Sequence, residues 1–174
     1  MALMNNLTKA REQIGKARSP RNEGETDILD KLKQEHEEVD ALLKQLVDTD
    51  SGSTRKSLLK KIKTALVPHL RAEQKVVYDA IIALRDKEAK VDGEEGHIEH
   101  QLAERVLLSL DKMASATSPE FTAGSKVLKE LVEHHVEEEE RNVWKDVREH
   151  FSDEERVEMC KKFEAAKTKV RIPS

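Results

Sequence analysis

The sequence has few of the residues that build β-sheets. Aromatic residues make up 3% of its 174 residues, and it contains only 6 glycines and 4 prolines. Strands favour aromatic and β-branched residues, whereas this chain is rich in Ala, Leu, Glu, Lys and Arg, which favour helices. It also lacks an apolar run near the roughly 20 residues that cross a bilayer. The composition predicts one all-α domain with no membrane partner.

Cysteine is nearly absent, and charge of one sign does not dominate. The single Cys160 cannot form an internal disulfide, and no segment has the short apolar core of a secretory signal. We therefore expect a reducing, cytoplasmic compartment. The formal net charge is -4, so no basic field covers the molecule. This balance argues against a nucleic-acid partner.

Residues 1–24 form a separate basic amphipathic segment, which ends near Ser19-Pro20 and Gly24. An organelle presequence can have this pattern. The alternative is an N-terminal helix that packs on the main domain or stays loose before it. Apolar residues recur in the segment at helical spacing beside basic residues: Leu3, Leu7, Ala10, Ile14 and Ala17 beside Lys9, Arg11, Lys16, Arg18 and Arg21.

The main domain, placed at residues 25–151, carries four amphipathic stretches with apolar residues at helical spacing. A charged connection with two glycines separates the second from the third. The fourth opens with a capping serine followed by proline, a combination typical of helix starts. The predicted helices lie at 27–47, from Leu58 to about Leu84, after the connection 90–96 through Leu110, and from Ser118 to about His150.

Residues 152–174 form a C-terminal helix and tail. Ser152 and Glu155 have the spacing of a capping box, which predicts a short helix through Met159 and Phe163. We expect this helix to pack across the end of the bundle in a structural role.

The main domain contains an internal repeat. EHEEVDALLKQL around His36 aligns without gaps with EHQLAERVLLSL around His100. In the same way HLRAEQKVVY, from His69, aligns with HVEEEERNVW, from His135. The chain is therefore two copies of one helical hairpin. Each copy has a histidine on its first helix and a His-x-x-x-Glu on its second.

The His-x-x-x-Glu spacing is suited to metal binding. Residues four apart lie on one helix face, about 6 Å apart along the axis, so both side chains can reach one site. Four imidazoles and two carboxylates buried among leucines would be unfavourable without compensating cations. Mixed imidazole and carboxylate ligation suits iron, manganese or zinc more than calcium or magnesium. The sequence predicts a metal site inside the bundle.

The order of these histidines and glutamates resembles that of the hemerythrin-like, or HHE cation-binding, domain family over roughly residues 27–150. The segments ILDKLKQEH and SPEF…LVEHHVEEEE are similar to the family's first and fourth helices. The resemblance implies an up-down-up-down four-helix bundle with a non-haem, oxo-bridged pair of iron ions, with Mn or Zn as alternatives. It also implies that His36 and His69 bind one iron, His100 and His135 bind the other, and Glu73 and Glu139 bridge them.

The chain departs from the oxygen-carrying members of the family at two positions. Those proteins have a further histidine four residues after the third-helix histidine and an aspartate five residues after the fourth-helix one. Here the positions hold Glu104 and Glu140, so the chain resembles the broader bacterial branch of the family. A carboxylate at Glu104 would favour the oxidised metal, so oxygen would be reduced and not released. Glu104 aligns with Asp40 in the internal repeat. Three interpretations of these two residues stay open: extra ligands, partners that orient the histidines, or charges that face solvent.

The resemblance implies a small ligand, such as oxygen, nitric oxide or peroxide, in sensing, detoxification or iron handling. One alternative is a di-iron oxidase or peroxidase. Another is a non-catalytic, metal-stabilised interaction module, filled with zinc. The chain lacks the paired cysteines near the N-terminus that family members with iron-centre repair activity carry.

The remaining unusual residues have structural interpretations. We expect His97, His134 and His150 to lie at the surface. Pro68 bends the second helix, and the bend either aims His69 or is one that the bundle needs anyway. Tyr78 and Trp144, nine residues past their histidines, are expected to plug the bundle end.

Overall fold

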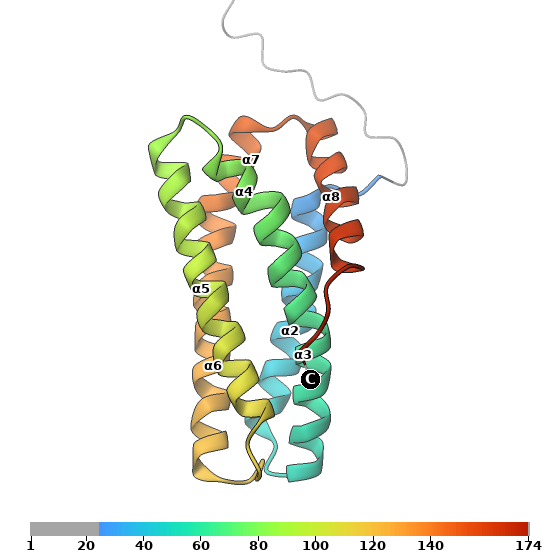
Figure 1. Cartoon of the computed structure of the whole chain (residues 1–174), viewed down its shortest axis with the longest axis vertical. Coiled ribbons are helices and arrows are strands. Elements are labelled where there is room, and N and C mark those ends of the chain that lie inside the picture. The colour runs from blue at the N-terminus through green and yellow to red at the C-terminus, as the bar shows by residue number, and fades with distance from the viewer. Residues whose placement is uncertain (1–24, 174) are drawn as a thin grey trace, which may run out of the picture.

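The computed structural model describes residues 25–173, which form helices and turns without any strand. The long helical stretches lie side by side along the long axis, and the shorter helix Asp153–Lys167 runs beside them (Figure 1). The predicted all-α class is confirmed, while the segment predicted at 1–24 lies outside the described residues. The elements are α2 (Ile28–Asp48), α3 (Gly52–Glu73), η1 (Gln74–Tyr78), α4 (Asp79–Ile82), α5 (Lys87–Asp111), α6 (Pro119–Glu138), η2 (Glu139–Val143), α7 (Trp144–His150) and α8 (Asp153–Lys167).

The helix starts follow the expected capping chemistry. Ser118 Oγ accepts a hydrogen bond from the backbone N–H of Phe121 at 3.1 Å, with Pro119 in the first turn. Ser152 and Glu155 form the predicted capping box at the start of α8. Such side-chain acceptors satisfy backbone N–H groups that have no partner inside the helix. Both predicted starts are confirmed.

Two apolar clusters fill the interior and leave a polar layer between them. The first cluster includes Leu43, Leu46, Ile62, Leu66, Leu107, Leu110, Phe121 and Leu128. The second includes Ile28, Leu32, Val77, Tyr78, Ile81, Val143, Trp144, Val147 and Phe163. On α2, on the arm from α3 into η1, and on the arm from α6 into η2, the chain passes from one cluster to the other at the histidines and glutamates of the repeat.

The prediction of a connection at 90–96 is wrong, because α5 begins at Lys87 and continues through both glycines. The Asp86 carboxylate caps this helix by accepting from the backbone N–H groups of its first turn. A Cβ on Gly96 would lie 2.6 Å from Cζ of Tyr78, and one on Gly93 would lie 2.6 Å from Cγ1 of Ile82. These glycines allow α5 to approach the preceding hairpin arm, and they do not break the helix.

Each copy of the hairpin has a π-helical turn directly at or after its buried glutamate. η1 follows Glu73, and η2 begins at Glu139. Pro68 lies inside α3, and the helix continues in α-geometry past it to Glu73. The departure from α-helical geometry on this arm therefore begins at Gln74. Single π-helical turns frequently occur at functional sites.

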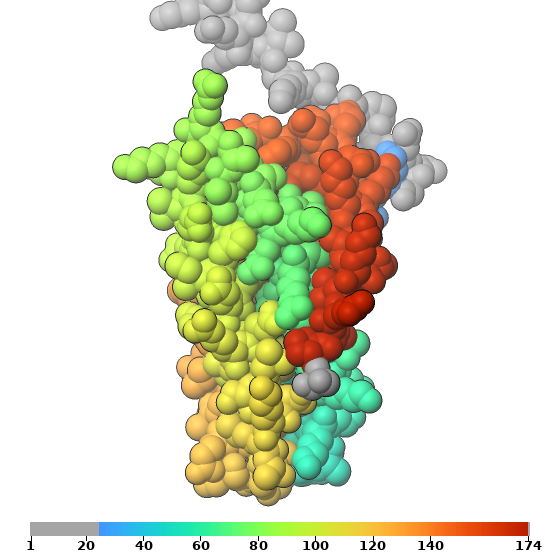
Figure 2. All heavy atoms as spheres, viewed as in Figure 1, coloured from blue at the N-terminus to red at the C-terminus, as the bar shows by residue number. Residues whose placement is uncertain are grey.

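The C-terminal helix lies along the bundle and not across its end. α8 contacts α2, α3 and η1, and Figure 2 shows it with the following residues against the side of the bundle. Arg156 of α8 is buried and donates a hydrogen bond to Asp27 Oδ2 at 2.8 Å. The start of α8 is thereby tied to the start of α2. No helix of the described part combines the length and apolarity that a membrane span requires.

Candidate metal centre

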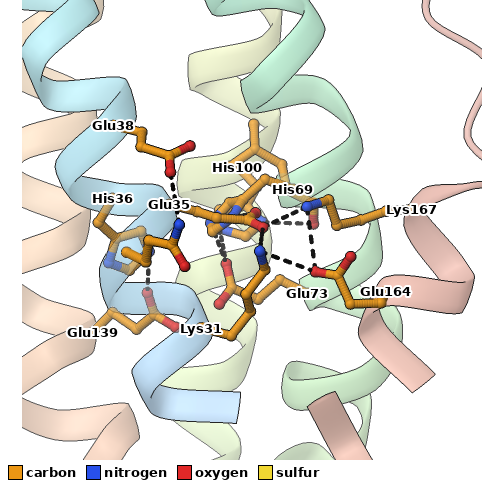
Figure 3. Close-up of polar contacts among 12 residues, drawn as sticks. Lys31, Glu35, His36, Glu38, His69, Glu73, His100, Glu139, Glu164 and Lys167 are labelled. Atoms are coloured by element: carbon orange, nitrogen blue, oxygen red, sulfur yellow. Dashed lines mark hydrogen bonds and ion pairs between the residues drawn. The ribbon is translucent and has the colours of Figure 1, made fainter. Parts of the chain in front are cut away.

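The six side chains that the sequence analysis selected lie together inside the bundle. All are buried, with exposed fractions between 0% and 6%. Figure 3 shows members of this set projecting from neighbouring helices toward one another. They are His36 from α2, His69 and Glu73 from α3, His100 from α5, His135 from α6 and Glu139 from η2.

Each carboxylate contacts one histidine from each hairpin. Glu73 Oε2 lies 3.3 Å from Nε2 of His69 and 3.5 Å from Nε2 of His100. Glu139 Oε2 lies 3.3 Å from Nε2 of His36 and 3.8 Å from Nε2 of His135. Two ligands that are each about 2.1 Å from one ion lie about 3.0–3.4 Å apart, depending on the geometry. Most of these separations are therefore close to those between ligands of a shared ion.

Five of the six side chains, all except Glu139, fall into two adjoining groups of donor atoms. Those of His36, His69 and Glu73 lie within 4.8 Å of one another, and so do those of Glu73, His100 and His135. Glu73 belongs to both groups. An arrangement of this kind can hold two neighbouring ions with a carboxylate between them.

The outward nitrogen of every histidine has an acceptor, which leaves Nε2 facing inward. A histidine that donates through Nδ1 presents the Nε2 lone pair to a metal, and the partner fixes the ring orientation. The four contacts are Glu35 with His69 at 3.0 Å, Glu99 with His135 at 2.8 Å, the Leu70 carbonyl with His100 at 3.2 Å, and Glu140 with His36 at 3.5 Å.

Sequence reasoning missed Glu35 and Glu99. Each directly precedes the first-helix histidine of its hairpin, but it bonds to the histidine of the second helix. The signal was present in the repeat, where the pair Glu-His occurs at both His36 and His100. The residue type alone could not tell this role from that of a surface carboxylate.

The pair His100 and His135 requires a positive charge between the rings. Their Nε2 atoms lie 2.9 Å apart. The Leu70 carbonyl can only accept, so Nδ1 of His100 is its donor, and the Glu99 carboxylate likewise accepts a hydrogen bond from Nδ1 of His135. Two Nε2 lone pairs at this distance would repel each other. Either a proton on one of the two Nε2 atoms or a shared metal ion removes the repulsion.

Five buried atoms of the centre have no hydrogen-bond partner among the described residues. They are Nε2 of His36 and both carboxylate oxygens of Glu73 and of Glu139. Buried polar atoms without partners are rare, because losing water without a replacement costs about 1–3 kcal/mol or more for charged groups. The donor set and these atoms together fit a pair of divalent cations.

The pKa values of the buried groups also indicate that the chain alone lacks positive charge at the centre. Burial and the adjacent charge of Glu73 raise the pKa of Glu139 well above its ordinary value. Burial opposes ionisation of Glu73 too, but His69 and His100 lower its pKa below the ordinary range. Although burial disfavours its charged form, Glu73 and Glu35 raise the pKa of His69 to about 9. Two carboxylates in contact cannot both ionise in a buried site without a compensating cation.

Tyr78 and Trp144 line the centre, so the prediction that they plug the bundle end is wrong. The Tyr78 ring lies 5.1 Å from the His100 ring, and the Trp144 ring stacks on His36 at 6.2 Å. Side chains on a helix lean toward its N-terminus, so a large ring reaches back over the preceding turn. The prediction used only the nine-residue separation from the histidines, which contains neither the lean of the side chains nor the π-helical turn.

Asp40 and Glu104 are engaged elsewhere. Asp40 Oδ2 accepts from Nζ of Lys44 at 2.6 Å, and Glu104 forms an ion pair with Arg71. Within the described residues, neither carboxylate belongs to a group of side chains close enough to share a metal ion. Of the histidines expected at the surface, His134 and His150 are exposed, whereas His97 is partly buried beside Tyr78.

The C-terminal helix contributes to the surroundings of His69. Phe163 packs edge-on against the His69 ring at 5.7 Å. Lys167 forms an ion pair with Glu35, the carboxylate that holds His69, as Figure 3 shows. Burial disfavours ionisation of Glu35, but the hydrogen bonds from His69 and Lys167 lower its pKa to about 2. Residues of α8 therefore help to hold the His69 ring in place, in addition to packing on the bundle.

Comparison with known proteins agrees with this geometry. The profile of the hemerythrin HHE cation-binding domain matches residues 27–145. The chain belongs to the hemerythrin HHE cation-binding domain family. The hemerythrin match covers α2 to the start of α7, so α8 follows the matched region. Phe163 and Lys167 thus lie outside the matched region.

Two curated relatives are similar to this hemerythrin-like chain. A DNA nickase of Nostoc sp. is 26% identical over 145 residues, covering 83% of this chain and 40% of the relative. An uncharacterized hemerythrin-like protein of Schizosaccharomyces pombe is 26% identical over 149 residues, covering 86% of this chain and 72% of the relative. The chain thus spans only two fifths of the length of the Nostoc protein. No solved structure gives a significant match.

Proposed function

We propose that this chain is a non-haem di-iron protein that binds or reacts with a small ligand such as oxygen, nitric oxide or peroxide. The observation that carries the proposal is the pair of adjoining donor groups that share Glu73. In this proposal, His36 and His69 hold one ion, His100 and His135 hold the other, and Glu73 and Glu139 bridge them. The alternating course of an up-down-up-down bundle is part of the same proposal.

Iron suits these donors because imidazole and carboxylate together favour iron, manganese or zinc over calcium and magnesium. When bound, a pair of iron ions would supply exchangeable electrons and open positions for a small ligand. We leave Asp40 and Glu104 out of the proposed ligand set, because Lys44 and Arg71 engage them.

The chain itself supplies orientation and a dry environment. The Nδ1 partners hold the four imidazoles, and apolar clusters lie on both sides of the polar layer. The Tyr78 hydroxyl is buried and has no hydrogen-bond partner among the described residues. In the chain alone, burial and the charge of Glu139 raise the pKa of this hydroxyl well above the ordinary value. It is available to donate a hydrogen bond to a small ligand in the site.

We do not extend the activity named for the Nostoc relative to this chain. That protein is much longer than the matched region, and the net charge of -4 here gives no general attraction for DNA. We propose that the chain has no nucleic-acid partner. Incubation with supercoiled plasmid and Fe²⁺ tests this, and conversion to the relaxed form beyond that caused by Fe²⁺ without the protein would contradict it.

Metal analysis with optical spectroscopy tests the main proposal. Protein purified from iron-supplied cells is expected to contain two iron ions per chain and to show near-ultraviolet and visible charge-transfer bands that change on addition of azide or peroxide. Zinc without such bands would instead indicate a metal-stabilised module. Sustained consumption of peroxide or oxygen would indicate an oxidase or peroxidase, whereas stoichiometric spectral change indicates binding.

A further inference from the structure

A hollow of about 210 Å³ between α2 and α6 leads from the surface to His36. Leucine and valine side chains form part of its wall. Carboxylates form the rest of its rim above the histidine: Glu37, Asp40, Glu133, Glu137 and Glu140. We call this hollow the acidic mouth.

Glu140 connects the acidic mouth with the centre. Its Oε1 lies 3.5 Å from Nδ1 of His36, and its side chain is 33% exposed. His36 itself is only 6% exposed, and its Nε2 has no hydrogen-bond partner among the described residues. That Nε2 lies 3.3 Å from Glu139. Oxygen and nitrogen donors therefore follow one another from solvent to the interior.

The mouth has more negative than positive charge. Lys44 pairs with Asp40 at 2.6 Å, and Lys129 pairs with Glu133 at 2.5 Å. Glu37 and Glu137 form no ion pair within the described residues. A cleft lined by charge of one sign raises the local concentration of the opposite ion and its rate of association.

The internal repeat provides a comparison, because an equivalent face lies between α5 and α3 around His100. There Glu37 is replaced by Gln101 and Glu140 by Gln74. Glu137 is replaced by Arg71, which forms an ion pair with Glu104, the equivalent of Asp40.

That equivalent face is also more closed. Arg71 donates a hydrogen bond to the backbone carbonyl of Arg171, which follows α8. Nδ1 of His100 has a backbone partner, the Leu70 carbonyl, in place of a carboxylate that reaches solvent. His100 is 1% exposed. The two copies of the hairpin have thus kept the donors and diverged at the face above them.

We infer that the acidic mouth is the route by which divalent metal ions reach the centre. Glu37 and Glu137 attract the ion, and Glu140 passes it to His36 and Glu139. The inference rests on the proposed metal-binding function, and it adds which of the two equivalent faces admits the ion.

Uptake of Co²⁺ by the metal-free chain tests this route, because Co²⁺ gives an optical signal on binding and does not react with oxygen as Fe²⁺ does. One variant combines Glu37→Gln with Glu137→Gln. The matched control combines Glu94→Gln with Glu130→Gln, which removes the same charge from exposed positions that do not line the mouth. We expect uptake at least about threefold slower in the mouth variant than in the control, with the same final number of ions.

A second variant, Glu137→Arg, copies the closed face. Its guanidinium would face Asp40 as Arg71 faces Glu104, so uptake should slow further than with glutamine. Raising the salt concentration should slow the wild type more than either mouth variant, because salt screens the attraction.

The outcomes separate the inference from the function on which it rests. Equal rates in the mouth variants and the control would overturn the route while leaving the metal centre in place. A lower final number of ions in the mouth variants would also overturn it, because Glu37 and Glu137 would then be needed to hold the ions. A wild-type chain that takes up no Co²⁺ and contains no iron would remove both proposals.

Discussion

Glu35 of α2 accepts a hydrogen bond from Nδ1 of His69 of α3 at 3.0 Å, across the two helices of one hairpin. The other hairpin repeats the contact between Glu99 and His135 at 2.8 Å. In each copy, the residue before one histidine orients the other. The two arms of a hairpin are therefore coupled at the level of the metal centre.

Removing these carboxylates is expected to weaken metal binding without removing a ligand. Glu35→Ala or Glu99→Ala should each lower metal affinity by about 10- to 100-fold, because the ring loses its orienting acceptor. Competition with a chelator of known affinity measures the change. Glu38→Ala is the control, since Glu38 lies on the exposed side of α2 and contacts Gln34. An affinity equal to that of the control would mean that Glu35 and Glu99 do not support the ligands.

Two neighbouring histidines on α6 should differ sharply in their effect on metal content. His135→Ala should reduce bound metal and lower the melting temperature of the metal-loaded protein, because binding to the folded state stabilises that state. His134→Ala should change neither, since the His134 side chain is 62% exposed. Elemental analysis and thermal denaturation of both variants provide the comparison. Equal metal content and melting temperature in the two variants would count against the ligand assignment.

Gly96→Ala should destabilise the protein even though alanine is the better helix former. The added Cβ would lie 2.6 Å from the buried Tyr78 ring, and such overpacking costs about 1–3 kcal/mol. In Gly124→Ala the closest atom is the flexible end of Leu110, at 2.8 Å. That variant should be less affected, because alanine favours a helix more than glycine does. Urea denaturation measures both free energies of unfolding. A Gly96→Ala protein as stable as the Gly124→Ala protein would mean that α5 can shift away from Tyr78.

Much of the centre could be predicted from the sequence because helix geometry is regular. His69 and Glu73 are four positions apart, as are His135 and Glu139, so each pair lies on one face of its helix. The internal repeat indicated that the two hairpins contribute equivalent side chains. The structure places the two members of each pair together, as the four-residue spacing requires. The two buried apolar clusters follow from the same periodicity.

The remaining features depend on contacts that one-dimensional spacing does not contain. Gly93 and Gly96 have the composition of a loop, but their role is close packing against Ile82 and Tyr78. The π-helical turns have no simple sequence signal, and they alter where Tyr78 and Trp144 point. The contact of Lys167 with Glu35 depends on how α8 docks, which neither segment specifies alone.

The partners Lys167 and Glu35 are 132 positions apart in the chain. During synthesis, α2 and α3 leave the ribosome well before Lys167 is made. Until then, Lys31 is the only one of the two lysine partners of Glu35 that has been made. The contacts of Lys167 with Glu35 and of Phe163 with His69 can therefore form only once nearly the whole chain is present.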